Sequence, residues 1–260
     1  MSTNTNGQNE VLQTQKATIR FGGLTAVNEL DMNVKQGEIY GLIGPNGAGK
    51  TTIFNLLTGV YEPTSGEIYF DGKRIDGLRP YQIASRGISR TFQNIRLFPS
   101  MSVLENVMTA CHIHVGQNLF DAVLRTPRYV NDEKKHREYC FELLEIFDLA
   151  RVSGEGGTSL PYGSQRRLEI VRALATRPKL LLLDEPAAGM NPSEQEDLMH
   201  LIKQIRDRFK LTILLVEHNM KVVMGVCERI QVVDYGKCIA LGLPQEIKND
   251  PKVIEAYLGD

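Results

Sequence analysis

Hydrophobic and polar residues alternate with a period of two in several stretches of the chain. These stretches are residues 11–21, 27–34 and 67–70, and the last is followed by an Asp71-Gly72 turn signal. A period of two puts successive side chains on opposite faces, so each stretch predicts a β-strand. Short strands of this kind favour an antiparallel or mixed sheet that packs on a main sheet.

A second group of segments is almost continuously apolar, which is typical of strands buried on both faces in a parallel sheet. These segments are residues 39–43, 180–183, 211–216 and 230–234. Apolar residues at helical spacing, or a proline at a helix start, predict helices between and after them. The predicted helices are residues 52–57, 80–86, 168–175, 192–209 and 251–258.

The middle of the chain has a helical pattern, and we expect residues 102–175 to form a helical subdomain inserted into the α/β core. Apolar residues share one face at 103–108 and again at 140–147. The charge run at 132–138 is expected to be the solvated face of the second helix. Pro127 is expected to break any helix around it, because proline lacks the N–H that a helix interior needs.

Composition places the chain among ordinary soluble proteins and limits its partners. It has 260 residues, of which 42% are hydrophobic and 23% charged, and its formal net charge is −1. The missing basic excess argues against nucleic acid as a partner. Residues 1–10 are polar and are predicted to be a disordered tail without a signal peptide, and residues 11–260 to be one domain. No apolar run approaches the ~20 residues that span a bilayer.

The four cysteines are predicted to be small buried residues rather than metal ligands or disulfide partners, because no C-x-x-C pair is present. They are Cys111, Cys140, Cys227 and Cys238.

A glycine-rich segment, here called the phosphate loop, fits the pattern G-x-x-x-x-G-K-[ST] between a predicted strand and a predicted helix. Its residues are Gly44, Pro45, Asn46, Gly47, Ala48, Gly49, Lys50, Thr51 and Thr52. Consecutive backbone N–H groups of such a loop form a cradle for a triphosphate, and the following helix directs its positive end at it. Lys50 is expected to contact the β- and γ-phosphates of ATP, and the Thr51 hydroxyl is expected to bind Mg²⁺.

Two acidic residues follow the apolar segment 180–183. An acid at the carboxyl end of a buried strand lies where open α/β sheets bind ligands. Asp184 is therefore expected to hold Mg²⁺, and Glu185 to polarise the water that attacks the γ-phosphate. A strand that merely ends in two surface acids is the alternative, and the phosphate loop argues against it.

Further motifs, in order along the chain, resemble those of the ABC-type ATPases. Residues 160–167, Leu-Pro-Tyr-Gly-Ser-Gln-Arg-Arg, resemble the family's signature motif and are here called the signature segment. Gln93 in Arg-Thr-Phe-Gln resembles the family's glutamine loop, which contacts water and Mg²⁺. His218 resembles the switch histidine, and Phe21 the aromatic residue that stacks on adenine. The resemblance covers residues 12–259.

The signature segment departs from the family's usual Leu-Ser-Gly-Gly-Gln. Pro161 replaces the serine, and Tyr162 replaces the first glycine. The resemblance implies that this segment contacts ATP held by a second subunit. The contact is then expected to come from Tyr162, Gly163 and Ser164 at the start of a helix. Asn191, in turn, stands where the family commonly has an aspartate.

Together with the motifs around residues 187–192 and 216–220 and with the C-terminal residues 249–259, these departures resemble the branched-chain amino-acid importer type of ABC ATPase. The resemblance implies an α/β fold of the P-loop NTPase class. Its core sheet is expected to be mostly parallel, with an antiparallel β subdomain and an inserted helical subdomain. It implies ATP and Mg²⁺ as ligands, and Glu185, His218 and Gln93 as catalytic residues.

The resemblance also implies partners and a location. The partners are a second ATP-binding subunit (a copy or a paralogue), integral membrane permease subunits and, indirectly, an extracytoplasmic solute-binding protein. The location is the cytoplasmic face of the inner or plasma membrane. Urea or amide import and lipid export remain alternatives. A soluble ABC ATPase is less favoured, because the coiled-coil or tandem-domain additions usual in such proteins are absent. A kinase or GTPase with the same loop is another alternative, but a GTPase is disfavoured because no Asn-Lys-x-Asp signature is present. Glu185 and His218 argue against a module that binds ATP without cleaving it.

Overall fold

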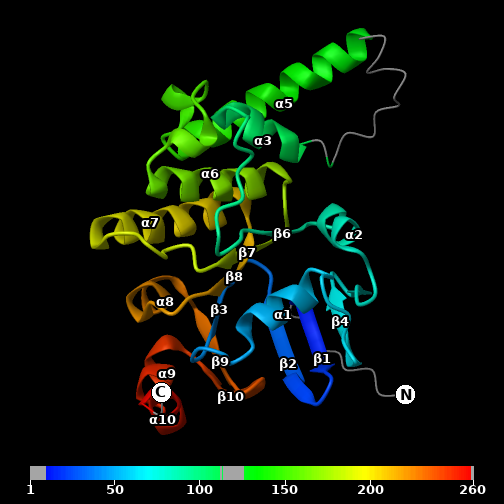
Figure 1. The fold of residues 1–260 in the computed structure, drawn as a ribbon, viewed down its shortest axis with the longest axis vertical. Helices are drawn as coiled ribbons and strands as arrows, with labels where there is room; N and C mark the ends of the chain where they lie inside the picture. Colours follow the sequence, from blue (N-terminus) through cyan, green and yellow to red (C-terminus); the bar gives the residue numbers. More distant parts are fainter. Residues whose placement is uncertain (1–9, 112, 114–125, 259–260) are drawn as a thin grey trace.

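The computed structural model describes residues 10–111, 113 and 126–258 (Figure 1). Its strands are β1 (Glu10–Phe21), β2 (Leu24–Lys35), β3 (Ile39–Ile43), β4 (Ser65–Phe70), β5 (Lys73–Arg74), β6 (Ile88–Arg90), β7 (Leu180–Asp184), β8 (Thr212–Val216), β9 (Arg229–Asp234) and β10 (Lys237–Gly242). Most of the predicted tail, residues 1–9, lies outside the described residues. Glu10 is the first residue of β1.

The α-helices are α1 (Lys50–Leu57), α2 (Pro80–Ser85), α3 (Val103–Cys111), α5 (Pro127–Ile146), α6 (Tyr162–Ala175), α7 (Pro192–Phe209), α8 (Met220–Val226), α9 (Pro244–Asn249) and α10 (Pro251–Leu258). Short 3₁₀ helices lie at Ala150–Val152 and Gly157–Ser159. Among the residues that the structure describes, no helix has the length and apolar character needed to cross a membrane.

Within the described part of the chain the strands form two sheets. The first has the order β2-β1-β4-β5 and is antiparallel throughout. The second has the order β10-β9-β3-β8-β7-β6, and all of its neighbours are parallel except β10 with β9. Since parallel strands end at the same edge, the residues that follow β3, β8, β7 and β6 lie along one edge of this sheet.

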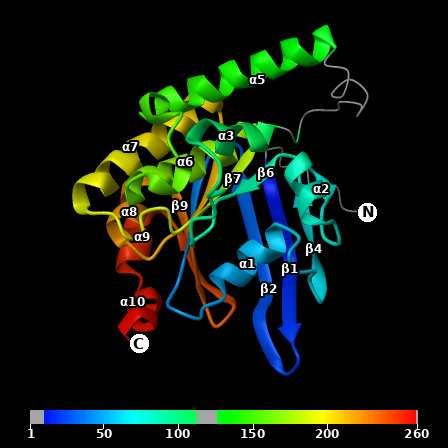
Figure 2. The same ribbon diagram turned by 45° about the horizontal axis from the view of Figure 1, so that its top comes forward.

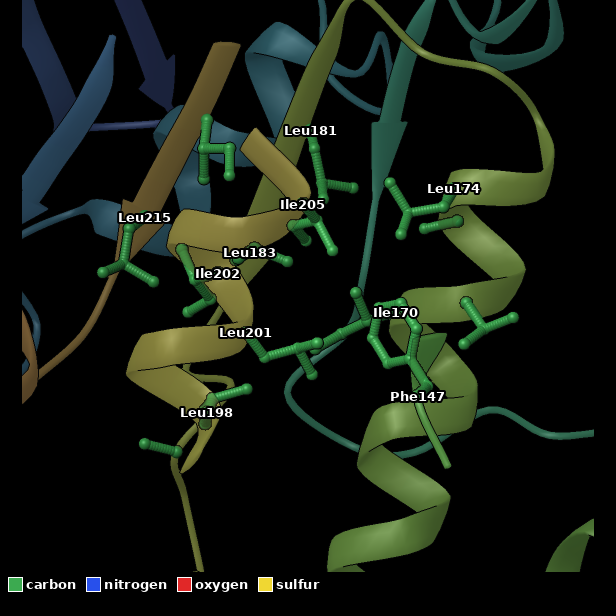
Figure 3. Packing of buried hydrophobic residues seen from close by; sticks show 14 of the residues in the cluster. Phe147, Ile170, Leu174, Leu181, Leu183, Leu198, Leu201, Ile202, Ile205 and Leu215 are labelled. Atoms are coloured by element: carbon green, nitrogen blue, oxygen red, sulfur yellow. The ribbon is translucent and has the colours of Figure 1, made fainter. Parts of the chain in front are cut away.

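Both faces of the six-stranded sheet are buried, which explains why its strands are continuously apolar. Leu181 and Leu183 of β7 belong to one hydrophobic core, whereas Leu180 and Leu182 belong to the other. In the first core β7 packs against α7 and α6, as Figure 3 shows for Leu183, Ile202 and Ile170 among others. The second core joins the sheet to α1 and the antiparallel sheet.

The helices α3, α5 and α6 pack on one another at one end of the molecule, away from the antiparallel sheet, in both views (Figures 1 and 2). Residues 132–138 lie in the middle of α5 and are mostly exposed, as predicted. The prediction for Pro127 was wrong, because α5 begins at this residue. Proline is tolerated at the first position of a helix, where its missing N–H would have no partner inside the helix.

Several short elements were not predicted, namely β5, β6, α8, α9 and β10. β6 has only three residues and pairs with β7, so its stability depends on a neighbour that is distant in sequence. The prediction for the cysteines holds for Cys111, Cys140 and Cys227, which are buried thiols, but it was wrong for Cys238, which is exposed. Cys238 lies on the edge strand β10, where one side of the strand has no neighbouring strand.

Candidate functional site

The phosphate loop connects β3 to α1, and its backbone is packed so closely that side chains are excluded at two positions. A Cβ on Gly44 would overlap the carbonyl oxygen of Val233. A Cβ on Gly49 would lie 2.6 Å from the carbonyl oxygen of Ala26, and Gly49 also has a φ of 101°, which favours glycine. The loop is thus held from behind by β9 and β2, which leaves its other side to a ligand.

Lys50 is the first residue of α1, and its side chain is buried beside the loop. Its Nζ donates hydrogen bonds to the carbonyl oxygens of Gly44 at 2.6 Å and Pro45 at 2.8 Å. The first turn of α1 contains no acidic residue, so the positive end of the helix is not neutralised by a side chain. Thr51 is exposed one residue further on. A buried ammonium group beside a helix N-terminus suits a polyphosphate.

Gln93, Glu185 and His218 follow three neighbouring strands, and the structure brings their side chains together. The Nε2 atom of Gln93 donates a hydrogen bond of 2.9 Å to Glu185 Oε2. The Nδ1 atom of His218 lies 3.5 Å from the same oxygen. Glu185 has a φ of 46°, an uncommon conformation for a residue other than glycine. Backbone strain of this kind occurs at functional sites, where the surrounding structure holds it.

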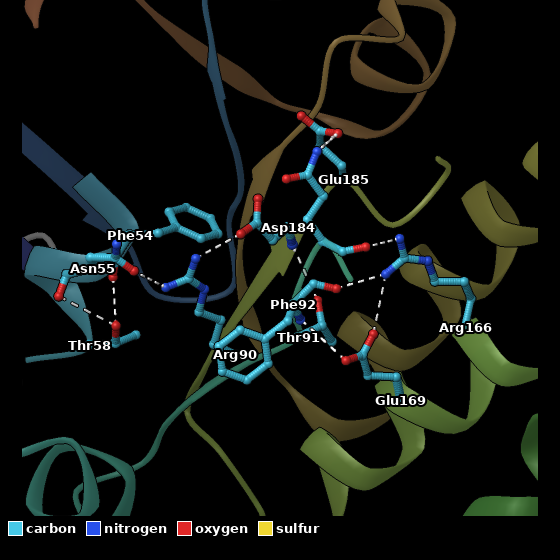
Figure 4. Close-up of polar contacts among 11 residues, drawn as sticks. Phe54, Asn55, Thr58, Arg90, Thr91, Phe92, Arg166, Glu169, Asp184 and Glu185 are labelled. Carbon is cyan, nitrogen blue, oxygen red and sulfur yellow. Dashed lines mark hydrogen bonds and ion pairs between the residues drawn. The ribbon is translucent and has the colours of Figure 1, made fainter. Parts of the chain in front are cut away.

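Asp184, at the end of β7, is buried and forms an ion pair that the sequence did not predict. The Nη2 atom of Arg90 lies 2.8 Å from Asp184 Oδ2, and the two side chains are only 8% and 5% exposed. Arg90 also donates a hydrogen bond of 2.7 Å to Asn55 of α1. Its guanidinium lies between the rings of Phe54 and Phe92, 5.3 and 5.2 Å from their centroids (Figure 4).

Glu217 is a second residue that the sequence analysis did not single out. Its carboxylate is fully buried and accepts hydrogen bonds from the backbone N–H groups of Ala187 at 2.8 Å, His218 at 3.2 Å and Asn219 at 3.3 Å. Burial raises the pKa of Glu217, and the hydrogen bond from Ala187 opposes that increase. Glu217 thereby ties the segment after β7 to the segment that carries His218. An acid at the end of the apolar strand β8 was the signal in the sequence.

The remaining predicted site residues lie on other parts of the chain. Phe21 ends β1 and is 44% exposed, with its ring edge-to-face against Tyr61 at 5.2 Å between centroids. An exposed aromatic residue of this kind is available for stacking on a base. Tyr162, Gly163 and Ser164 form the first turn of α6, which has no side-chain cap and no acidic residue. Their contact with ATP stays a prediction.

The residues present fit ATP together with Mg²⁺. Mg²⁺ is usually bound through one or two protein oxygens, with phosphates and water completing its coordination. The Thr51 hydroxyl, Asp184 and the Gln93 amide contain oxygens of this kind. One oxygen of Asp184 is paired with Arg90, so the predicted Mg²⁺ contact falls to its other oxygen and stays a prediction. Among the described residues no group of three or more His, Cys, Asp or Glu could hold a metal ion. The fold and this site define a nucleoside triphosphatase of the phosphate-loop class.

Comparisons with known proteins narrow this class. The family model described as ABC transporter matches residues 27–188, and the model described as branched-chain amino acid ATP-binding cassette transporter matches residues 237–260. The chain belongs to the ABC transporter family of ATP-binding proteins. The predicted family, its branched-chain amino-acid type and the predicted fold class are confirmed.

Relatives are similar over nearly their whole length. The high-affinity branched-chain amino acid transport ATP-binding protein BraF of Pseudomonas aeruginosa is 46% identical, with 96% of this chain and 98% of that protein covered. LivG of Escherichia coli K12, with the same description, is 47% identical, covering 93% and 95%. A solved structure of an ABC transporter's ATP-binding cassette in its ADP conformation has a TM-score of 0.84 at 30% identity, covering 96% and 99%.

Proposed function

We propose that this chain is the ATP-hydrolysing subunit that powers a membrane importer for branched-chain amino acids. The meeting of Gln93, Glu185 and His218 along the edge of the sheet that also carries the phosphate loop is the observation that supports ATP cleavage. The solute is inferred from the relatives, which are described as branched-chain amino acid transport proteins.

Each residue has a distinct role in the proposed reaction. The backbone of the phosphate loop and the Lys50 ammonium bind the phosphates of ATP. Glu185 accepts a proton from the attacking water. Gln93 and His218 both lie at Glu185 Oε2, so they hold this carboxylate in place and thereby orient the water. Mg²⁺, when bound by Thr51, Asp184 and Gln93, would neutralise charge on the phosphates.

Two copies of the chain, or the chain and a paralogue, are proposed to bind ATP between them. The first turn of α6 presents backbone N–H groups of Tyr162, Gly163 and Ser164 to a phosphate of ATP held by the other subunit. A solved dimeric structure of a bacterial ABC transporter cassette, 25% identical with a TM-score of 0.75, supports the dimer. ATP binding would close the dimer, and hydrolysis would open it.

A groove beside Gln93 is the proposed contact with the membrane permease subunits. It has a volume of about 600 Å³ and lies between α2, β6, α3 and α6. Its lining includes Ile83, Phe98 and Ala110, with Arg96 and Arg172 among its charged residues. This lining suits an amphipathic helix with an acidic side chain. Permease subunits bound in this groove would hold the chain at the cytoplasmic face of the membrane, which is its proposed location. The solute-binding protein would act on the opposite side.

Uptake of labelled solutes tests this function. The chain and its own permease subunits are expressed in cells that lack branched-chain amino acid importers. Labelled leucine should enter with the wild-type chain and not with the Glu185→Gln variant. Entry of urea in place of leucine would give the chain a different solute. The lipopolysaccharide export system ATP-binding protein LptB of Haemophilus influenzae is 36% identical to this chain, so lipid export is the main alternative to import. If no labelled solute entered the cells and lipid were exported, import would be rejected.

A further inference from the structure

Two buried charged residues lie on α6, one turn beyond its start. Arg166 Nη1 is 3.3 Å from Glu169 Oε2, and the side chains are only 3% and 2% exposed. Moving two charges out of water is costly, and a well-packed apolar pair at such a position is often equally stable or more stable. Packing alone therefore does not account for these charges, and their hydrogen bonds show what else they do.

Both side chains bind the backbone of residues 92–96, here called the glutamine segment because it contains Gln93. Arg166 donates to the carbonyl oxygen of Phe92 at 2.7 Å and to that of Gln93 (Figure 4). Glu169 Oε1 accepts from the N–H groups of Phe92 and Arg96, each at 3.4 Å. One turn of α6 thus contacts the glutamine segment at both of its ends.

The contacts connect two parts of the site that lie on different elements. At one end of the connection is the first turn of α6, where the nucleotide of the other subunit is proposed to bind. At the other end is Gln93, whose side chain donates to Glu185 of the same chain. Because Arg166 binds the carbonyl group of Gln93 itself, a displacement of α6 is transmitted directly to the residue that orients Glu185.

We propose that Arg166 and Glu169 are positioning residues that couple the first turn of α6 to Gln93, so that nucleotide bound at one composite site affects hydrolysis at the other. The proposal rests on the proposed function for its two-subunit arrangement. The coupling is reciprocal in binding energy, as any coupling between two sites must be. It gives the two ATP sites of the dimer a direct route of communication.

Arg167 provides a matched control, because it neighbours Arg166 on the same helix, is not one of the three residues expected to contact ATP, and faces other partners. Its guanidinium lies 3.8 Å from Asp148 and 3.7 Å from Asp197. The test variants are Glu169→Gln and the double variant Arg166→Met/Glu169→Gln. The double variant removes both charges of the buried pair. Arg172, which lies 4.0 Å from Glu169, still donates a hydrogen bond to the carbonyl oxygen of Arg96, so the double variant should fold even where a single replacement does not.

The first experiment measures backbone hydrogen exchange of the nucleotide-free full chain and does not depend on its activity. The amides of Phe92 and Arg96 should exchange faster by on the order of tenfold in the double variant. Their acceptor changes from a charged carboxylate to a neutral amide oxygen, and the contacts of Arg166 with the carbonyl groups of Phe92 and Gln93 are lost. They should be unchanged in Arg167→Ala. Unchanged exchange in the double variant would overturn the proposal, whatever the protein's function is.

The second experiment measures steady-state ATP hydrolysis and affinity for a non-hydrolysable ATP analogue. The wild-type chain should hydrolyse ATP with a Hill coefficient above one. In the double variant the Hill coefficient should fall to one. The value of kcat should fall by up to about 10²-fold, because small displacements of catalytic groups slow a reaction to that extent. The affinity for the analogue should be unchanged. An equal loss in Arg167→Ala, or a retained Hill coefficient, would overturn the coupling. A wild-type chain that does not hydrolyse ATP would instead reject the proposed function.

Discussion

Replacing Arg90 by methionine should destabilise the folded chain strongly, because Asp184 would keep its buried carboxylate and lose its cation. The two side chains are 8% and 5% exposed and the charged atoms are 2.8 Å apart. Breaking a buried ion pair by removing one partner costs about 3–5 kcal/mol. Methionine still fills the space between Phe54 and Phe92, so the loss reflects the charge more than the packing.

A surface arginine provides the comparison. Arg74 pairs with Glu67 at 2.6 Å and with Asp76 at 2.8 Å, but its side chain is 53% exposed. Water screens such pairs, so Arg74→Met should change the stability of the folded chain little. The N–O distances at the two sites are similar, whereas the exposed fractions of the two arginine side chains differ widely. The comparison therefore tests the effect of burial.

Thermal unfolding followed by circular dichroism measures both variants. For a chain of this size 1 kcal/mol shifts Tm by about 2–4 °C. Arg90→Met should therefore lower Tm by roughly 6–20 °C, whereas Arg74→Met should leave Tm nearly unchanged. Adding Asp184→Asn to Arg90→Met should recover part of the loss, because no unpaired charge remains. Equal Tm values for Arg90→Met and Arg74→Met would refute the argument.

Further predictions concern nucleotide binding and the dimer. Lys50→Ala should weaken ATP binding in calorimetry, because it removes the buried ammonium group at the phosphate loop, and an unchanged affinity would contradict that role. Pro161→Ala should barely change the ATPase rate of the assembled transporter, because Pro161 is exposed and provides no side-chain cap. Gly163→Asp should be severe, since its Cβ would lie 2.9 Å from Glu194 Oε1 and its charge would face the phosphate. If Gly163→Asp kept the ATPase rate and Pro161→Ala lowered it, the signature segment would be wrongly aligned. In light scattering the Glu185→Gln chain should double its mass of 29.2 kDa with Mg-ATP and not with Mg-ADP, and a monomer in both would favour a paralogue as partner.

Most strands of the core, and Asp184 and Glu185 at the end of β7, could be predicted because each depends on a local signal. Gln93 and His218 were identified by resemblance, and β6, which precedes Gln93, was not predicted. The apolar segments 39–43 and 180–183 and the proline at the start of α7 define their elements without help from distant residues. Gln93, Glu185 and His218 meet because they follow β6, β7 and β8, which are neighbouring parallel strands of one sheet.

The contacts that connect these elements could not be predicted, because they depend on residues far apart in the sequence. Arg90 pairs with Asp184 across 94 positions, and Arg166 binds the carbonyl group of Phe92 across 74. Nothing near either arginine in the sequence indicates its partner. The helix start at Pro127 depended on Thr126, whose hydroxyl accepts the N–H of Tyr129 and caps α5.

The central claim is that Glu185 activates the attacking water but is not needed for ATP to bind. Single-turnover hydrolysis of γ-labelled ATP, with the full chain in excess, tests this claim most directly. The Glu185→Gln variant should bind ATP with wild-type affinity and release phosphate slower by on the order of 10²-fold or more, as expected when a general base is removed. Phosphate release at nearly the wild-type rate would contradict the claim and assign the base to another residue.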